Sequence, residues 1–301
     1  MGTSKSRLKK QAGRFSKVDN IPFSMPVNSI DSPVVMAGFY VNYEKAREQL
    51  PGNEVHPFKL WNGKALLVIT VVNYINTPIG KYIEYSIALA CTHGSKPAPR
   101  MIPLMLPKLY GVGQYILDLP VSTEISVKGG KGIWGMPKHQ ASLDFLVEDK
   151  TISCQYDLDG QMVMRLDVDK PSNVLIPINT GAANYCQYRG MLMKSYIYFK
   201  GKMGFKLFKK GSAKIMLGNH PKADVLKSLE IAADPMFTMY FPKTSGFLDD
   251  YFECWFLTHD KMPEGNIEGL ESVINLGQGQ DWLPAPNREE TNKSKNKEQY
   301  V

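Results

Sequence analysis

The chain has 301 residues, 43% of them apolar, which is enough to bury a substantial hydrophobic core in one large domain or two closely associated halves. Its net charge of +7 is concentrated at the ends. Residues 1–20 hold six basic groups against one acidic group, and residues 288–301 hold four against three. The body of the chain is therefore nearly neutral, which argues against nucleic-acid binding.

The cysteines and the apolar runs restrict the class of protein further. The four cysteines lie far apart with no CxxC spacing, so neither a disulfide framework nor a zinc site is indicated. The longest apolar run, Ala65 to Val72, is well short of the roughly 20 residues that span a bilayer. We therefore predict a soluble protein of the reducing cytoplasm.

The two ends of the chain, residues 1–20 and 286–301, are rich in Lys, Ser, Asn and Glu. Such segments cannot offset their ordering entropy by burial, and we predict flexible tails around a single domain of residues 21–285. The first tail begins Met1-Gly2-Thr3-Ser4-Lys5-Ser6, which fits the N-myristoylation pattern and is followed by basic residues. Contact with a membrane surface through an acylated N-terminus is the alternative to a solvated tail.

The first predicted elements in chain order are one helix and two strands. The helix covers Tyr43 to Leu50 and stops at Pro51. The strands cover Lys64 to Tyr74 and Ile83 to Cys91, which are rich in β-branched, aromatic and other apolar residues.

The middle of the chain predicts a β-hairpin. Thr151 to Leu158 and Gln161 to Val168 form its arms, because Asp159-Gly160 suits the two positive-φ positions of a type I′ turn. Met193 to Phe199 is predicted as a further strand.

The last predicted elements are a second strand pair and a second helix. Lys206 to Phe208 and Lys214 to Leu217 are predicted to pair around Lys210-Gly211. A helix is predicted over Pro221 to Ile231, with proline in its first turn. Strands and helices do not alternate regularly, so the predicted fold class is α+β, mainly an antiparallel sheet or barrel with a few peripheral helices.

The most unusual stretch is Val127 to His139, VKGGKGIWGMPKH. It contains a literal GxGxxG, but a dinucleotide-binding loop opens a helix at that motif. Here Pro137 and a strand-like segment follow instead. We interpret the stretch as a rigid turn with close backbone approach, which holds Lys138 next to the apolar groups of Trp134 and Met136.

Lys138 and Glu84 are the candidate catalytic residues. Burial disfavours an ammonium and so favours the neutral, nucleophilic amine of Lys138; the alternative is a lysine that points into water. Glu84 is a carboxylate within an otherwise apolar strand, where it is costly unless paired or protonated. It is either a general acid or base, or a solvent-facing group on an edge strand. The histidines show no spacing typical of a metal site, and no metal or cofactor is predicted.

The segment from Gly130 to Lys138 resembles the part of acetoacetate decarboxylases that ends in Pro-Lys, where that lysine is the Schiff-base nucleophile. Glu124 lies at the spacing of a family glutamate, and Glu84 in Tyr-x-Glu-x-Ser resembles the family's second catalytic carboxylate. The elements at Tyr43 to Pro51 and Gly211 to Val225 resemble family elements in the same order.

The resemblance implies a β-barrel-like α+β domain, usually in large homo-oligomers, and a small-molecule keto acid or ketone as substrate. It implies that Lys138 forms an iminium with the substrate and that Glu84 assists proton transfer. His139, Trp134, Met136 and Glu124 are the residues expected in or around the substrate pocket.

Four positions depart from the family pattern. His139 stands where the family usually has a second lysine, and is more consistent with a structural or supporting role than with a base. The arginine that meets the substrate carboxylate is expected near Asn28 to Pro33, where this chain has none. The other family carboxylate is expected around Ile69 and Thr70, and Gly132 replaces a commonly acidic residue.

Three functional hypotheses follow. The first is decarboxylation of acetoacetate or a related β-keto acid through a lysine iminium. The second keeps the Schiff base for aldol condensation, dehydration or hydration, which the missing arginine and carboxylate favour. The third is a non-catalytic barrel that binds a hydrophobic carbonyl compound.

Overall fold

The computed structural model describes residue 9 and residues 13–171, 176–261, 273 and 276–289. The initial Met1-Gly2 pattern, residues 290–301 and most of residues 1–12 therefore lie outside the described residues.

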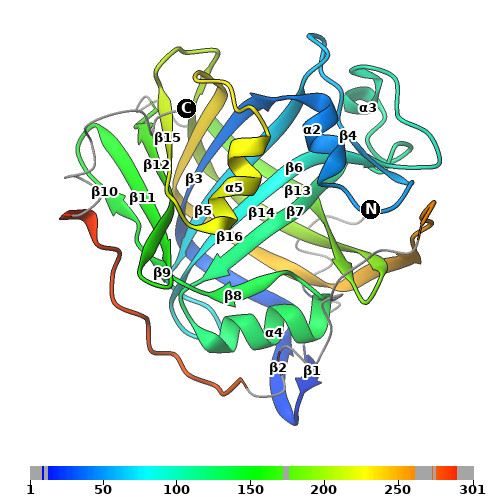
Figure 1. Ribbon diagram of the computed structural model, residues 1–301. Helices are drawn as coiled ribbons and strands as arrows, with labels where there is room; N and C mark the ends of the chain where they lie inside the picture. Colours follow the sequence, from blue (N-terminus) through cyan, green and yellow to red (C-terminus); the bar gives the residue numbers. More distant parts are fainter. Residues whose placement is uncertain (1–8, 10–12, 172–175, 262–272, 274–275, 290–301) are drawn as a thin grey trace.

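A nine-stranded sheet closes into a barrel (Figure 1). Seven of its strands form the closed ring, in the order β6-β5-β3-β16-β14-β13-β7 and back to β6. The edge strands β4 (Val55–Pro57) and β8 (Lys138–Gln140) extend it. Neighbours within the ring pair antiparallel, apart from the parallel pair of β7 and β13. The ring strands are β3 (Val27–Val41), β5 (Ala65–Tyr74), β6 (Tyr82–His93), β7 (Gly113–Val121), β13 (Ile176–Tyr188), β14 (Met191–Leu207) and β16 (Pro235–Phe256).

A second, five-stranded sheet packs against the outside of the barrel, beside the helix α5 (Pro221–Ser228) (Figure 1). It contains β9 (Ser142–Leu143), β10 (Leu146–Val147), β11 (Thr151–Leu158), β12 (Gln161–Asp169) and β15 (Ala213–Leu217). The other described helices are α2 (Tyr43–Glu48), α3 (Ile102–Met105) and α4 (Glu124–Trp134). The predicted fold class, a mainly β barrel with few helices, is confirmed.

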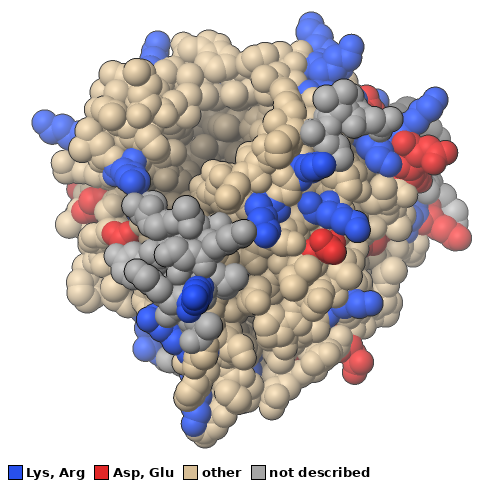
Figure 2. Space-filling view, turned by 180° about the vertical axis from the view of Figure 1, so that it is seen from behind, with Lys and Arg blue, Asp and Glu red and all other residues tan. Residues whose placement is uncertain are grey.

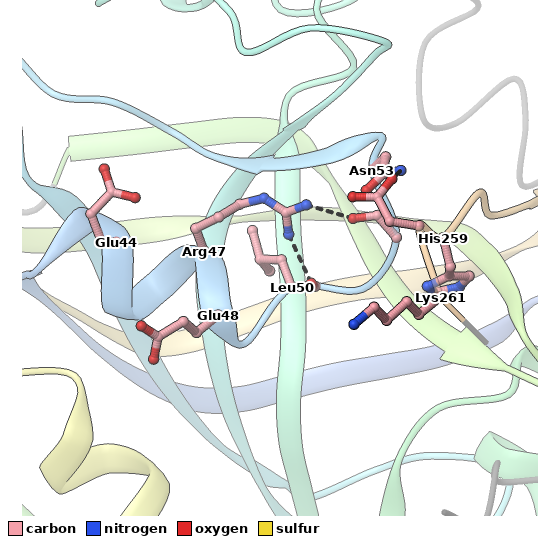
Figure 3. Close-up of a pocket in the computed structure, with 9 residues that line it drawn as sticks. Glu44, Arg47, Glu48, Leu50, Asn53, His259 and Lys261 are labelled. Atoms are coloured by element: carbon pink, nitrogen blue, oxygen red, sulfur yellow. Dashed lines mark hydrogen bonds between the residues drawn. The ribbon is translucent and has the colours of Figure 1, made fainter. Parts of the chain in front are cut away.

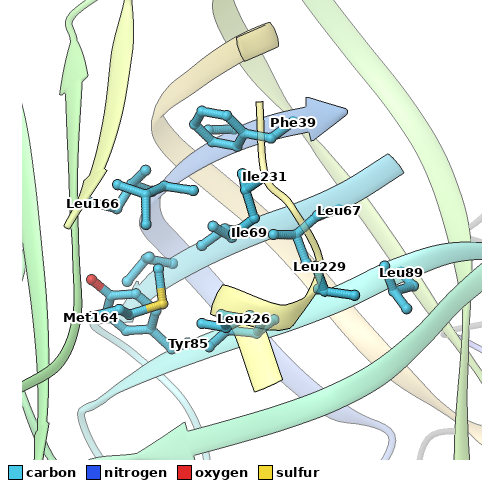
Figure 4. Packing of buried hydrophobic residues seen from close by; sticks show 14 of the residues in the cluster. Phe39, Leu67, Ile69, Tyr85, Leu89, Met164, Leu166, Leu226, Leu229 and Ile231 are labelled. Carbon is cyan, nitrogen blue, oxygen red and sulfur yellow. The ribbon is translucent and has the colours of Figure 1, made fainter. Parts of the chain in front are cut away.

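The main hydrophobic core lies between the barrel and this second sheet. Successive side chains of a strand point to opposite faces, so alternate residues of β3, β5 and β6 form the barrel's contribution to the core. Figure 4 shows Phe39, Ile69 and Tyr85 from these strands packed near Leu166 of β12 and Leu226 of α5. The remaining residues of the same strands face the barrel interior, which leaves that interior free for a site.

Most predicted elements are present. The hairpin of β11 and β12 turns at Asp159 and Gly160, with φ of 51° and 75°. The helices at Tyr43 and Pro221 are α2 and α5, and both have a side-chain N-cap. The pair predicted around Lys210-Gly211 is wrong: β14 ends at Leu207 after a long pairing with β16, and β15 pairs with β12.

The ends of the domain lie further out than predicted. β1 (Arg14–Val18) falls within the predicted N-terminal tail, yet it forms a hairpin with β2 (Ile21–Met25) and buries Val18. At the other end, Arg288 pairs with Asp144 at 2.7 Å. The prediction of flexible tails is therefore wrong for residues 14–20 and 286–289. In the described part of the chain, no helix is long and apolar enough to cross a bilayer.

Candidate active site

The interior of the barrel encloses a cavity of about 230 Å³. In β6, Tyr82, Glu84 and Ser86 line this cavity, while Ile83 and Tyr85 between them belong to hydrophobic core clusters. The period of two in the sequence Tyr-Ile-Glu-Tyr-Ser thus separates a polar inner face from an apolar outer face. Figure 2 shows that one face of the molecule is hollowed, and that the visible walls of this hollow carry neither basic nor acidic residues.

Lys138 enters the cavity from β8. This short strand pairs parallel with the end of β7, where Leu119 is opposite Lys138. The lysine is only 6% exposed. Its Nζ lies 2.6 Å from Oε2 of Glu84 and donates a hydrogen bond to Oγ of Ser126 at 3.0 Å. The structure therefore brings the two predicted catalytic residues together as a buried ion pair, and adds a hydroxyl from α4.

The glycine-rich stretch is a helix and not the predicted rigid turn. α4 covers Glu124–Trp134 and ends at Gly135, which has φ of 65°. At Gly130, an added Cβ would lie 2.4 Å from Cδ and 2.7 Å from Cε of Lys138. Carbon atoms in contact stay about 3.5 to 4.0 Å apart, so the missing side chain of Gly130 makes room for the alkyl chain of Lys138.

Two tyrosines complete the polar end of the cavity. Tyr74 donates a hydrogen bond to Oε1 of Glu84 at 3.4 Å, and its ring stacks on that of Tyr82 with centroids 4.5 Å apart. Burial, followed by the charge of Glu84, raises the pKa of both phenols well above the usual value. Both hydroxyls therefore stay protonated and available as donors at neutral pH.

His139 points away from the amine of Lys138, as expected for the next residue in a strand. Its Nε2 lies 2.8 Å from the hydroxyl of Tyr156, and its Nδ1 lies 3.5 Å from Asp118. Lys222 of α5 reaches the same carboxylate at 2.8 Å. Burial lowers the pKa of His139, so this imidazole is neutral at pH 7 and does not supply a cation beside Lys138.

Of the other residues expected around the pocket, the structure places one at the cavity and two away from it. Met136 lines the cavity. Trp134 belongs to the same apolar cluster as Met136 but donates a hydrogen bond from Nε1 to the carbonyl of Asp249 at 3.3 Å. Glu124 stands in the first turn of α4, near Gly277 and Gly279. Neither Trp134 nor Glu124 is among the residues that line the cavity.

Two of the four departures from the family pattern fall on the cavity wall. Among the described residues that line the cavity, Lys138 and Glu84 alone carry a charge. Where the family arginine is expected, Asn28, Ser29 and Ser32 line the wall, and Thr70 occupies the place of the other carboxylate.

Some groups of the site were not singled out from the sequence. Tyr82 could have been predicted, because it lies two residues before Glu84 and so faces the same side of the strand. Ser126, by contrast, is ordinary in the sequence and reaches Lys138 only because α4 folds under β8.

A second hollow lies at the surface near the end of α2 (Figure 3). It is lined by charged residues of α2 and of residues 259–261. Arg47 donates hydrogen bonds to the carbonyl oxygens of Leu50 and Gly52, at 2.9 and 2.6 Å. Its guanidinium thus holds the loop after α2, and no buried nucleophile faces this hollow among the described residues.

The fold and the site together define a closed mixed β-barrel with a buried lysine–carboxylate pair in its interior. A family model for acetoacetate decarboxylase matches residues 15–180, more than half of the chain. The protein therefore belongs to the acetoacetate decarboxylase family. A search of curated protein sequences finds no match.

Solved structures share this fold at low sequence identity. Acetoacetate decarboxylase from Legionella pneumophila is 14% identical, with a TM-score of 0.55 over 85% of this chain and 96% of that one. A second acetoacetate decarboxylase structure is 12% identical, with a TM-score of 0.54 over 85% of this chain and 98% of that one. The enduracididine biosynthesis enzyme MppR, complexed with the condensation product of pyruvate and imidazole 4-carboxaldehyde, is 14% identical with a TM-score of 0.52, over 76% of this chain and 88% of that one.

Proposed function

We propose that the protein decarboxylates a β-keto acid through an iminium formed between the substrate and Lys138. The observation that carries this proposal is the ion pair of Lys138 and Glu84, 2.6 Å apart inside a mostly apolar cavity. An amine attacks a carbonyl only in its neutral form. At this separation the ammonium can pass its proton directly to the carboxylate, which leaves a neutral amine facing the cavity.

The same proton then serves the next step. Lys138 adds to the keto carbon, and the carbinolamine loses its hydroxyl as water when Glu84 returns the proton to it. The carbon–carbon bond to the carboxylate breaks, carbon dioxide leaves, and the electron pair moves to the iminium nitrogen to give an enamine. Glu84, reprotonated from solvent, protonates the enamine carbon, and water releases the ketone and the free amine.

The apolar lining supports bond cleavage. The iminium and the carboxylate are both charged before cleavage, whereas the enamine and carbon dioxide are neutral. A medium of low dielectric constant disfavours separated charges more than neutral products. The cavity therefore favours the step in which both charges disappear.

Borohydride trapping tests the Schiff base. The protein is incubated with acetoacetate and sodium borohydride, digested with a protease that does not cleave at lysine, and analysed by peptide mass. We expect a reduced adduct on Lys138 and none on Lys128, a buried lysine of α4 that pairs with Asp19 instead. An adduct elsewhere, or none with any keto acid or ketone, would overturn the proposal and leave a carbonyl-binding barrel.

Release of carbon dioxide tests the reaction. It should disappear in Lys138→Met, and in the double variant Lys138→Met/Glu84→Gln, which leaves no buried carboxylate unpaired. Circular dichroism and thermal unfolding of both variants show whether the fold is kept. Trapping without release of carbon dioxide would refute decarboxylation and retain the Schiff base.

The second candidate is condensation or dehydration through the same iminium. The absence of arginine from the described cavity lining favours it, because a neutral carbonyl substrate needs no carboxylate partner. The complex of MppR with a condensation product provides a related barrel with such a compound bound. A product with the same or a larger number of carbons, formed from a ketone and an aldehyde without gas, would identify this activity.

A further inference from the structure

We infer that the substrate carries an extended apolar substituent on its keto group, which runs from Lys138 along the barrel toward Gln114 and Asn184. A medium-chain alkyl ketone or aryl ketone, or the matching β-keto acid, is the class that fits. This inference rests on the proposed function, because it places the keto carbon at Lys138.

The first argument is the length of the cavity. Leu119 of β7 is opposite Lys138, and Gln114 lies five residues earlier on the same strand. At a rise of about 3.3 Å per residue, the two levels are roughly 16 Å apart. Both Lys138 and Gln114 line the same cavity. A four-carbon keto acid is shorter than two strand residues, roughly 6 Å, and would leave most of this length unfilled.

The second argument is the chemistry of the opposite wall. β14 and β16 contribute Ile197, Phe199, Phe241, Phe247 and Leu248 to the cavity lining. The rings of Phe199 and Phe241 meet edge to face, with centroids 6.1 Å apart. Such a wall offers water few hydrogen-bond partners, so an apolar chain that displaces water from it gains free energy.

The third argument is charge. Among the described lining residues, no cation other than Lys138 is available to a second acidic group. At the far level, Gln114 and Asn184 are direct neighbours across the parallel pair of β7 and β13. Their amides are uncharged donors and acceptors, so a charged chain end finds no counter-ion there among the described lining residues.

A series of unbranched methyl ketones from butanone to 2-nonanone tests this inference, since every member presents the same reactive carbonyl. The measured quantity is the ketone concentration that gives half-maximal borohydride adduct on Lys138. Each fully buried methylene lowers this concentration by up to about fourfold. Across the five added methylenes we expect a decrease of at least about 30-fold.

Variants of β13 test the path of the chain. Ala182 lines the cavity opposite Ile197, whereas the neighbouring Ala183 does not. Ala182→Leu fills the far end and should raise the half-maximal concentration of 2-tridecanone, whose chain is long enough to approach this level, about tenfold relative to butanone, through loss of buried methylenes. The matched control Ala183→Leu should leave the ratio of the two ketones unchanged.

The outcomes separate the two proposals. Adducts that form equally well with butanone and 2-nonanone would overturn this inference and leave the Schiff base intact. A length preference that Ala182→Leu leaves unaltered would overturn the path toward β13. Absence of adducts with every ketone and with acetoacetate would overturn the proposed function itself.

Discussion

Gly130→Ala is expected to slow the reaction of Lys138 with a carbonyl compound much more than it lowers the free energy of unfolding. The new Cβ would lie 2.4 Å from Cδ of Lys138, more than 1 Å inside the usual carbon–carbon contact of about 3.5 to 4.0 Å. The lysine must change its side-chain conformation, or α4 must move away from β8. Either shift disturbs the contacts of Nζ with Glu84 and Ser126, which are 2.6 and 3.0 Å long.

The two effects of this substitution differ in size. Overpacking costs about 1 to 3 kcal/mol, and replacement of a helical glycine by alanine returns about 1 kcal/mol, so we expect a net loss of at most about 2 kcal/mol in unfolding free energy. A displacement of about 1 Å at a reacting group costs about 100-fold in rate. Denaturant unfolding measures the first quantity, and the rate of borohydride adduct formation on Lys138 measures the second.

Gly132→Ala is the matched control in the same helix. Its Cβ would meet Val18 of β1 at 2.6 Å, and not the lysine. We therefore expect a comparable loss of stability with an unchanged adduct rate. An adduct rate in Gly130→Ala within twofold of the parent protein would refute the reasoning that this glycine positions Lys138.

The remaining predictions concern charge. Glu84→Gln removes the proton donor and acceptor beside Lys138, and we expect turnover to fall about 100-fold or more, measured as release of carbon dioxide; an unchanged rate would exclude Glu84 from proton transfer. Burial lowers the pKa of His139, so below about pH 6.5 the imidazole takes up a proton more readily in the unfolded chain than in the folded protein. The free energy of unfolding therefore decreases as the pH falls through this range. His139→Gln should therefore lose less unfolding free energy between pH 7 and pH 5 than the parent protein; an equal loss would contradict this. Ser29→Arg places a guanidinium on the cavity wall and should improve trapping of acetoacetate over butanone about tenfold or more, the strength of one charged hydrogen bond. Ile30→Arg, at an exposed position that does not line the cavity, is its control, and equal ratios in the two variants would refute the effect.

Local patterns in the sequence predicted much of the fold. The Asp159-Gly160 turn specifies its own hairpin, because both positions need positive φ. The period of two around Glu84 put the carboxylate on one face of a strand, although it left open whether that face met solvent or an interior. The closed ring decides this question, and the ring depends on the pairing of β7 with β13 and of β3 with β16, which are distant in sequence.

The glycine-rich helix was missed for a physical reason. Each glycine in a helix costs about 1 kcal/mol relative to alanine, and α4 contains three of them, at positions 129, 130 and 132. Their neighbours explain them: Phe23, Lys138 and Val18 occupy the space where a Cβ would be. Tertiary packing thus outweighs helix propensity here, and those partners cannot be identified from local sequence.

The charge balance of the cavity links the missing arginine to the proposed substrate. Transfer of a proton from Lys138 to Glu84 changes an ion pair into a neutral pair, and formation of the iminium restores a positive charge beside the carboxylate. With a neutral ketone, the cavity therefore holds no net charge in any of these states, and avoids the penalty of several kcal/mol for one unpaired buried ion. A β-keto acid adds a negative charge, and cleavage does not remove it: the carboxylate and the iminium are neutralised together, and Glu84 keeps the remaining negative charge until it takes a proton from solvent. Without an arginine, this added charge weakens binding of the keto acid. The affinity for substrate must then come from another part of the molecule. An apolar substituent that packs against the wall formed by Phe199 and Phe241 would supply it.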